Sequence, residues 1–187
     1  LYIRINLIDF SMCTAVVIQV MVFGNLKEIS GTGVAFSSNP SNGDKEVFGE
    51  YLLKAQGEDI VAGIRTPEPI SKLKEQLPEI YDQFIKLAKV LEDHNKDMQD
   101  IEFTIENGKL YLLQTRNGKR SPYAAAKIAV DMVNEGIVTK EEAIMKVDPS
   151  VLPQLLHGNF DPEATKTAVL LGQGITGSAG VAIGRVM

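Results

Sequence analysis

Hydrophobic and polar residues alternate most regularly between residues 100 and 116, in the stretch DIEFTIENGKLYLLQTR. The apolar positions of its first half are Ile101, Phe103 and Ile105. This two-residue period is typical of a strand with one buried face. Asn107-Gly108 follows as a tight-turn dipeptide, and Leu110–Leu113 runs back as a second strand. The pattern predicts a β-hairpin with one apolar and one polar face.

The rest of the chain predicts strands before this hairpin and helices on both sides of it. The strand candidates are Thr14–Val22, Gly31–Phe36, Tyr51–Ala55 and Asp59–Ile64, with a turn at Asn39–Asp44. Apolar residues recur every three or four positions over Ser71–Asp93, which predicts an amphipathic helix with a kink or restart at Pro78. Further helices are predicted at Pro122–Asn134, at Lys140–Lys146 and from Asp161 onward.

Two registers of the hairpin are open. A two-residue turn pairs Glu106 with Lys109 and places Glu102 opposite Leu113. A three-residue loop with a bulge at Gly108 pairs Glu106 with Leu110 and places Glu102 opposite Gln114. We favour the three-residue loop because it brings Glu102 and Gln114 together.

The polar residues at the open end of the hairpin suggest chemistry. Asp100, Glu102, Gln114 and Arg116 combine acceptor oxygens with a guanidinium, which suits Mg²⁺ bound together with phosphate oxygens. The alternative is an amphipathic hairpin whose polar side chains are only solvated. Weaker phosphate-binding candidates are the backbone of Gly31–Gly33 and the side chains of Lys119 and Arg120.

Composition and charge limit the kinds of partner and the cell compartment that we expect for this chain. A net charge of −5 argues against nucleic acid. The apolar run Ala15–Phe23 is interrupted by Gln19 and is too short to cross a bilayer, so no membrane partner is expected. The single Cys13 excludes an internal disulfide framework and favours a reducing compartment, so we expect a cytoplasmic protein.

Several long blocks resemble the pyruvate, phosphate dikinase family. They are MVFGN, SGTGVAFSSNPSNGDK, GEYLLKAQGEDIVAGIRTP and DMQDIEFTIENGKLYLLQTRNGKR, with a Gly-rich stretch near the carboxyl end. The resemblance runs from about Thr14 to the end, whereas residues 1–13 form an atypical amino end whose origin the sequence leaves open.

The resemblance implies an α+β fold. Residues 14–120 would form one lobe of an ATP-grasp-like nucleotide-binding domain, with an antiparallel or mixed sheet and a packed helix. Residues 121–171 would form a helical linker, and residues 172–187 the Gly-rich start of a truncated phosphohistidine domain. It also implies that Glu102 and Gln114 bind Mg²⁺, that Asp100 and Arg116 join them in holding ATP, and that Arg116 is catalytic.

The resemblance further implies a parent enzyme that converts ATP, phosphate and pyruvate into AMP, pyrophosphate and phosphoenolpyruvate through a carrier histidine. Its partners would be ATP, phosphate, and the parent's other lobe, phosphohistidine domain and pyruvate-binding domain, in a homodimer. This piece alone is expected to be inactive. The alternatives are a relative of phosphoenolpyruvate synthase or glucan dikinase, and a non-catalytic remnant of the fold.

Overall fold

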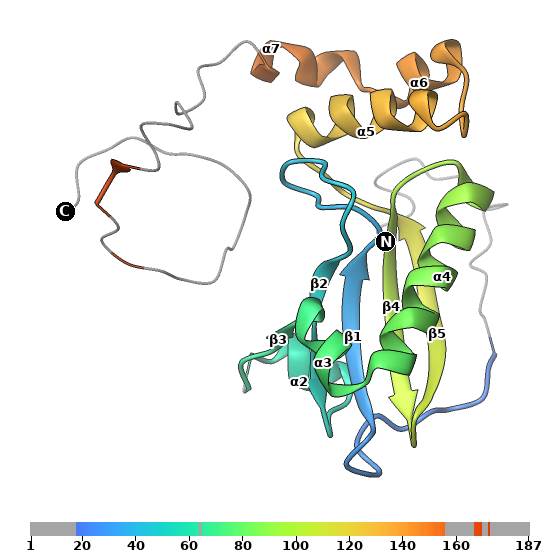
Figure 1. The fold of residues 1–187 in the computed structure, drawn as a ribbon, viewed down its shortest axis with the longest axis vertical. Helices are drawn as coiled ribbons and strands as arrows, with labels where there is room; N and C mark the ends of the chain where they lie inside the picture. The colour runs from blue at the N-terminus through green and yellow to red at the C-terminus, as the bar shows by residue number, and fades with distance from the viewer. Residues whose placement is uncertain (1–17, 64, 156–166, 170–171, 173–187) are drawn as a thin grey trace, which may run out of the picture.

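The computed structural model describes residues 18–63, 65–155, 167–169 and 172. Its centre is a five-stranded sheet with the order β3-β2-β1-β4-β5, in which every neighbouring pair is antiparallel. The strands are β1 (Gly31–Phe36), β2 (Phe48–Leu53), β3 (Glu68–Pro69), β4 (Gln99–Glu106) and β5 (Lys109–Asn117). The sheet and the helices around it confirm the predicted α+β class (Figure 1).

The helices are short except for two. They are α2 (Gly57–Val61), α3 (Leu73–Gln76), α4 (Pro78–Asn95), α5 (Pro122–Asn134), α6 (Lys140–Lys146) and α7 (Leu152–Leu155), with 3₁₀ turns at Ile70–Lys72 and Pro149–Val151. Among the residues that the structure describes, no helix is long and apolar enough to span a membrane.

Helix α4 covers one face of the sheet (Figure 1). Ile101, Phe103 and Ile105 of β4 point to this face and are fully buried in the main core. Phe84 of α4 lies against Phe103, with ring centroids 4.9 Å apart. We call the opposite side of the sheet the open face; it carries the partly exposed Phe48 together with the polar positions of the hairpin.

A second core joins the sheet to the helices that follow it. Met98, just before β4, packs with Ile128 and Met132 of α5, and Phe36 of β1 lies against the same cluster. The turn at Asn39–Asp44 adds polar contacts, because Ser121 donates its backbone N–H to Pro40 O and its hydroxyl to Ser41 O. Helix α5 is therefore fixed to the end of the sheet.

Most of the predicted elements have the expected type. Gly31–Phe36, the turn at Asn39–Asp44, Pro122–Asn134 and Lys140–Lys146 are confirmed. The apolar period over Ser71–Asp93 is divided between α3 and α4, and Pro78 begins α4. A proline is tolerated in a first helical turn because its missing N–H would have no partner there, so the predicted restart is correct.

Two strand predictions are wrong, and one helix prediction falls outside the described residues. Asp59–Ile64 begins within α2, because the Asp59 carboxylate accepts the backbone N–H of Gln56 at 2.8 Å and caps a helix start. Residues 18–22 of the predicted strand Thr14–Val22 form no strand, and Ile18 is 95% exposed. Residues 14–17 and the helix predicted from Asp161 lie in undescribed segments.

Glu92 is the buried acid at the junction of α4, α5 and the turn. It is 3% exposed, and its Oε1 lies 3.7 Å from Lys45 Nζ, while Lys45 also pairs with Glu135. Burial raises the pKa of the Glu92 carboxyl above its ordinary value, and the charge of Lys45 and a hydrogen bond with Ser37 offset the burial only in part. The folded protein therefore binds this proton more tightly than the unfolded chain does.

Because the pKa of Glu92 is raised, its contribution to the free energy of unfolding falls as the pH rises. The stabilising contribution of Glu92 is present below pH 4.5 and is lost as the pH rises through the raised pKa. Relative to wild type, Glu92→Gln should therefore gain unfolding free energy as the pH rises toward neutrality, measured by urea unfolding at several pH values. Glu142→Gln is the control, because hydrogen bonds from Thr139 and Lys96 lower the pKa of Glu142 and reverse the trend. Parallel profiles for Glu92→Gln and wild type would contradict the prediction.

Candidate phosphate and metal site on the open sheet face

The hairpin turn has two residues, so the three-residue loop favoured from sequence is wrong. Glu106 pairs with Lys109, and both Asn107 (φ 51°) and Gly108 (φ 76°) adopt left-handed backbone conformations. Asn-Gly tolerates positive φ at both central positions, and this turn matches the twist of the two strands. The turn chemistry therefore determined the loop length.

A bulge further along β5 nevertheless brings the expected pair together. Phe103 pairs with Leu112, whereas Glu102, which precedes Phe103 in β4, pairs with Gln114. Leu113 is therefore one extra residue in β5. Without this insertion the two-residue turn would place Glu102 opposite Leu113. It would also turn Gln114 and Arg116 toward α4, because side chains alternate between faces. The bulge therefore returns the polar residues of β5 to the open face.

The structure brings all four predicted site residues together. Asp100 pairs with Arg116 and Glu102 with Gln114, and these two pairs are neighbours on the open face of the β4–β5 ladder. Arg116 Nε donates a hydrogen bond to Asp100 Oδ2 at 2.8 Å. This bond, with the charges of Asp100 and Glu102, raises the pKa of the Arg116 guanidinium further above its already high value. The guanidinium therefore stays charged and is oriented from its Nε side.

Asp100 is the unusual member of the group. It is 6% exposed, and its Oδ1 atom is buried with no hydrogen-bond partner among the described residues. A buried carboxylate oxygen without a partner costs free energy, so such an atom usually serves a ligand, an ion or a water. Glu102 is half-buried, and Gln114 and Arg116 are exposed, so the group presents its remaining polar atoms outward.

These donors fit Mg²⁺ that is shared with phosphate and do not form a closed metal cage. Within the described ranges, no group of three His, Cys, Asp or Glu side chains is arranged to hold a metal ion. Mg²⁺ commonly takes one or two carboxylates from the protein and completes its octahedron with waters and substrate phosphates. Glu102 and Gln114, with Asp100 beside them, supply this kind of partial ligand set.

Two of the three weaker phosphate-binding candidates have structural roles. Gly31–Gly33 lie in β1, which pairs with strands on both sides, and the Thr32 hydroxyl donates to Phe103 O at 3.1 Å. Arg120 Nη1 lies 2.6 Å from Asp97 Oδ1, and both side chains are largely buried, whereas Lys119 is exposed. We therefore remove Gly31–Gly33 and Arg120 from the candidate site.

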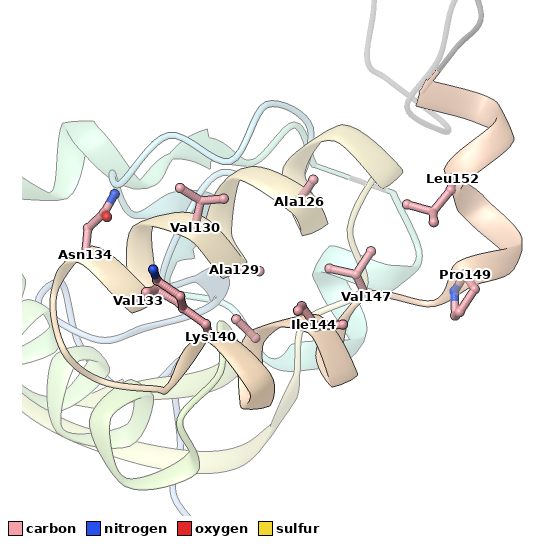
Figure 2. A pocket seen from close by; sticks show the side chains of 11 residues that line it. Ala126, Ala129, Val130, Val133, Asn134, Lys140, Ile144, Val147, Pro149 and Leu152 are labelled. Carbon is pink, nitrogen blue, oxygen red and sulfur yellow. The ribbon is translucent and has the colours of Figure 1, made fainter.

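An apolar groove lies elsewhere, between α5 and α6. Its volume is about 600 Å³, and Val130, Val133, Ile144 and Leu152 are among its lining residues (Figure 2). Asn134 and Lys140 are the only polar side chains in its lining. The groove contains no carboxylate and does not overlap the polar group of the open face.

The open face of this antiparallel sheet presents paired acidic, amide and guanidinium side chains, and these groups suit a divalent cation and phosphate oxygens. The family described as "Pyruvate phosphate dikinase, AMP/ATP-binding domain" matches residues 1–87 and 74–136 of this chain. The chain belongs to this family.

Curated relatives agree with the family match. The chain is 55% identical to pyruvate, phosphate dikinase of Clostridium symbiosum over 185 residues, which cover 99% of this chain and 21% of the relative. It is 51% identical to the Rhizobium meliloti enzyme, over 93% of this chain and 20% of that protein. It is 50% identical to the chloroplastic enzyme 1 of Zea mays, over 100% of this chain and 20% of that protein. The chain thus spans about a fifth of the length of these relatives.

The two neighbouring basic residues after β5 should differ sharply in their effect on stability. Arg120→Ala leaves the buried Asp97 carboxylate without its ion-pair partner, with only the Met98 N–H still bonded to Oδ1, so we expect a loss of about 3 kcal/mol of unfolding free energy. Lys119→Ala, the matched control, should change it by less than about 0.5 kcal/mol because Lys119 is exposed. Thermal or urea unfolding measures both. Equal small losses would show that the Arg120–Asp97 pair does not hold the chain after β5.

Proposed function

We propose that this chain is the lobe of a pyruvate, phosphate dikinase that holds Mg²⁺-ATP and phosphate. The observation that carries the proposal is the pairing of Asp100 with Arg116 and of Glu102 with Gln114 on one open face, beside the unpartnered Asp100 Oδ1. The family match supports AMP/ATP binding at the level of the whole domain.

Each residue would have a separate role. Glu102 and Gln114 would hold Mg²⁺, which, when bound, neutralises negative charge on phosphate oxygens. Arg116 keeps its Nη groups available because Asp100 takes the Nε–H, so the planar fork can contact two phosphate oxygens. Asp100 holds Arg116 in place and offers Oδ1 to the ion or to one of its waters. Phosphoryl transfer needs alignment and charge neutralisation more than covalent help, and these side chains provide both.

The parent enzyme would convert ATP, phosphate and pyruvate into AMP, pyrophosphate and phosphoenolpyruvate. A carrier histidine outside this chain would accept the phosphoryl group and pass it on. The proposal includes a lobe over residues 14–120, a helical linker over 121–171 and the start of a phosphohistidine domain at 172–187, in a cytoplasmic homodimer. The names of the relatives support this phosphate-using reaction over that of a phosphoenolpyruvate synthase or glucan dikinase.

Metal binding can be tested on this chain alone. Mn²⁺, a paramagnetic substitute for Mg²⁺, should broaden the backbone NMR signals of Glu102 and Gln114 when ATP is present. Glu102→Gln removes one carboxylate charge and should weaken this effect at least about tenfold. Glu141→Gln on α6 is the control, because it removes one exposed carboxylate far from β4 in the sequence and on another element. Equal broadening in wild type and Glu102→Gln would exclude Glu102 as a ligand.

The role in the full reaction needs the intact parent enzyme. Glu102→Ala should abolish AMP formation from ATP and phosphate, because this half-reaction uses the proposed site. Exchange between pyruvate and phosphoenolpyruvate should remain largely intact, because it takes place in another domain. Separate assays of the two half-reactions measure this difference. Equal loss of both activities would contradict the assignment of Glu102 to the nucleotide half-reaction.

A further inference from the structure

Gln99 is a buried polar residue next to the proposed site that has no assigned role. It is the first residue of β4, directly before Asp100, and it is 1% exposed. Because side chains alternate along a strand, Gln99 points to the α4 side of the sheet while Asp100 points to the open face. Gln99 therefore cannot contact a ligand on the open face directly.

The Gln99 side chain bonds the two residues that flank Arg116 on β5. Thr115 Oγ1 donates to Gln99 Oε1 at 2.9 Å, and Gln99 Nε2 donates to Asn117 Oδ1 at 3.1 Å. Arg116 lies between them in sequence and projects to the opposite face, toward Asp100. One amide thus holds β5 on both sides of the proposed catalytic arginine.

The same amide is anchored to the rest of the lobe. Gln99 Oε1 also accepts from Asn95 Nδ2 at 3.0 Å, and Gln99 Nε2 donates to Asp97 O at 2.9 Å. The backbone of Gln99 exchanges hydrogen bonds with Ser37, which follows β1, at 3.0 and 2.9 Å. A buried polar network whose members are all satisfied is rigid, because every alternative arrangement loses hydrogen bonds.

Strand β5 needs such a fixed point. It is an edge strand of the described sheet, and Leu113 interrupts its ladder to β4 just before the site residues. If the bulge were to close by a slip of one residue, Thr115 and Asn117 would turn to the open face and Arg116 toward α4. The bonds of Thr115 and Asn117 to Gln99 exist only in the register that presents Arg116 to Asp100.

We propose that Gln99 is a positioning residue that holds β5 beyond the Leu113 bulge, so that Arg116 faces phosphate with its Nε on Asp100. This inference rests on the proposed function in one respect: the position of Arg116 affects ligand binding only if Arg116 binds phosphate. Its structural part, the dependence of the Arg116–Asp100 bond on Gln99, can be measured without a ligand. Failure of one part is therefore distinguishable from failure of the other.

The test is the hydrogen-exchange rate of the Arg116 Nε–H in a ¹⁵N-labelled chain, with Arg116→Lys identifying the signal. The double variant Thr115→Val with Asn117→Ala removes both bonds from β5 and leaves Gln99 in place; both residues are exposed, so the chain should fold. The exchange should accelerate by about tenfold, the effect of losing about one hydrogen bond of restraint. Thr115→Ser alone keeps the hydroxyl that bonds Gln99. In this variant the Arg116 Nε–H should exchange as slowly as in wild type.

Asn95→Ala provides the matched control. It removes one bond to the same Gln99 oxygen but leaves both contacts to β5 and the bonds of Gln99 to Asp97 O and Ser37. Arg116 exchange should therefore stay within about twofold of wild type. Unfolding midpoints are measured for every variant. Unchanged Arg116 exchange in the double variant, or equal acceleration in Asn95→Ala, overturns the proposal. The Mn²⁺ experiment separately reports whether the site binds metal and nucleotide.

Discussion

The proposed site depends on one extra residue in an edge strand. The Asn107-Gly108 turn determines the pairing of the first half of the hairpin, from Glu106 with Lys109 to Phe103 with Leu112. Continued without change, this pairing would direct Gln114 and Arg116 to the α4 side of the sheet, away from Asp100 and Glu102. The Leu113 bulge reverses the direction of these side chains and places both residues beside Asp100 and Glu102.

The two faces of the sheet show why the polar group is stable where it is. On the covered face, Phe103 and its neighbours bury apolar surface against α4, and this burial is the main favourable term in folding. The open face carries less apolar burial and keeps Glu102, Gln114 and Arg116 accessible. The apolar core and the proposed ligand contacts thus lie on opposite sides of the same strands. The alternation of residues along β4 achieves this without a separate binding loop.

Sequence patterns predicted the elements that depend on local rules. The hairpin, the restart at Pro78 and the helices at Pro122–Asn134 and Lys140–Lys146 follow from periodicity, turn residues and caps. The predicted three-residue loop is wrong because Asn-Gly favours a two-residue turn, and the Leu113 bulge brings Glu102 and Gln114 together without a longer loop. The strand predicted at Asp59–Ile64 is wrong because the Asp59 carboxylate accepts the backbone N–H of Gln56 and caps the start of α2. In both cases local backbone chemistry was the stronger signal.

Burial of polar residues could not be read from the sequence. Arg120 stands in a basic run that suggests an exposed phosphate contact, yet it is paired with Asp97 inside the structure. Gln99 looks like an ordinary strand residue, although its amide connects α4, β4 and β5. The partners of Arg120 and Gln99 lie far away in the sequence or on another helix or strand. Only the folded chain brings these partners within hydrogen-bond distance.

Asp100 shows how these constraints meet at one side chain. One of its oxygens orients Arg116, and the other is buried without a partner among the described residues. An apolar residue at this position would avoid the cost of that oxygen but would leave the arginine without an orienting group. Retaining the acid is consistent with a site in which the cost is offset when an ion or water reaches Oδ1. The arrangement is therefore what the proposed function requires, a lobe whose polar pairs on β4 and β5 are completed by a bound phosphate ligand.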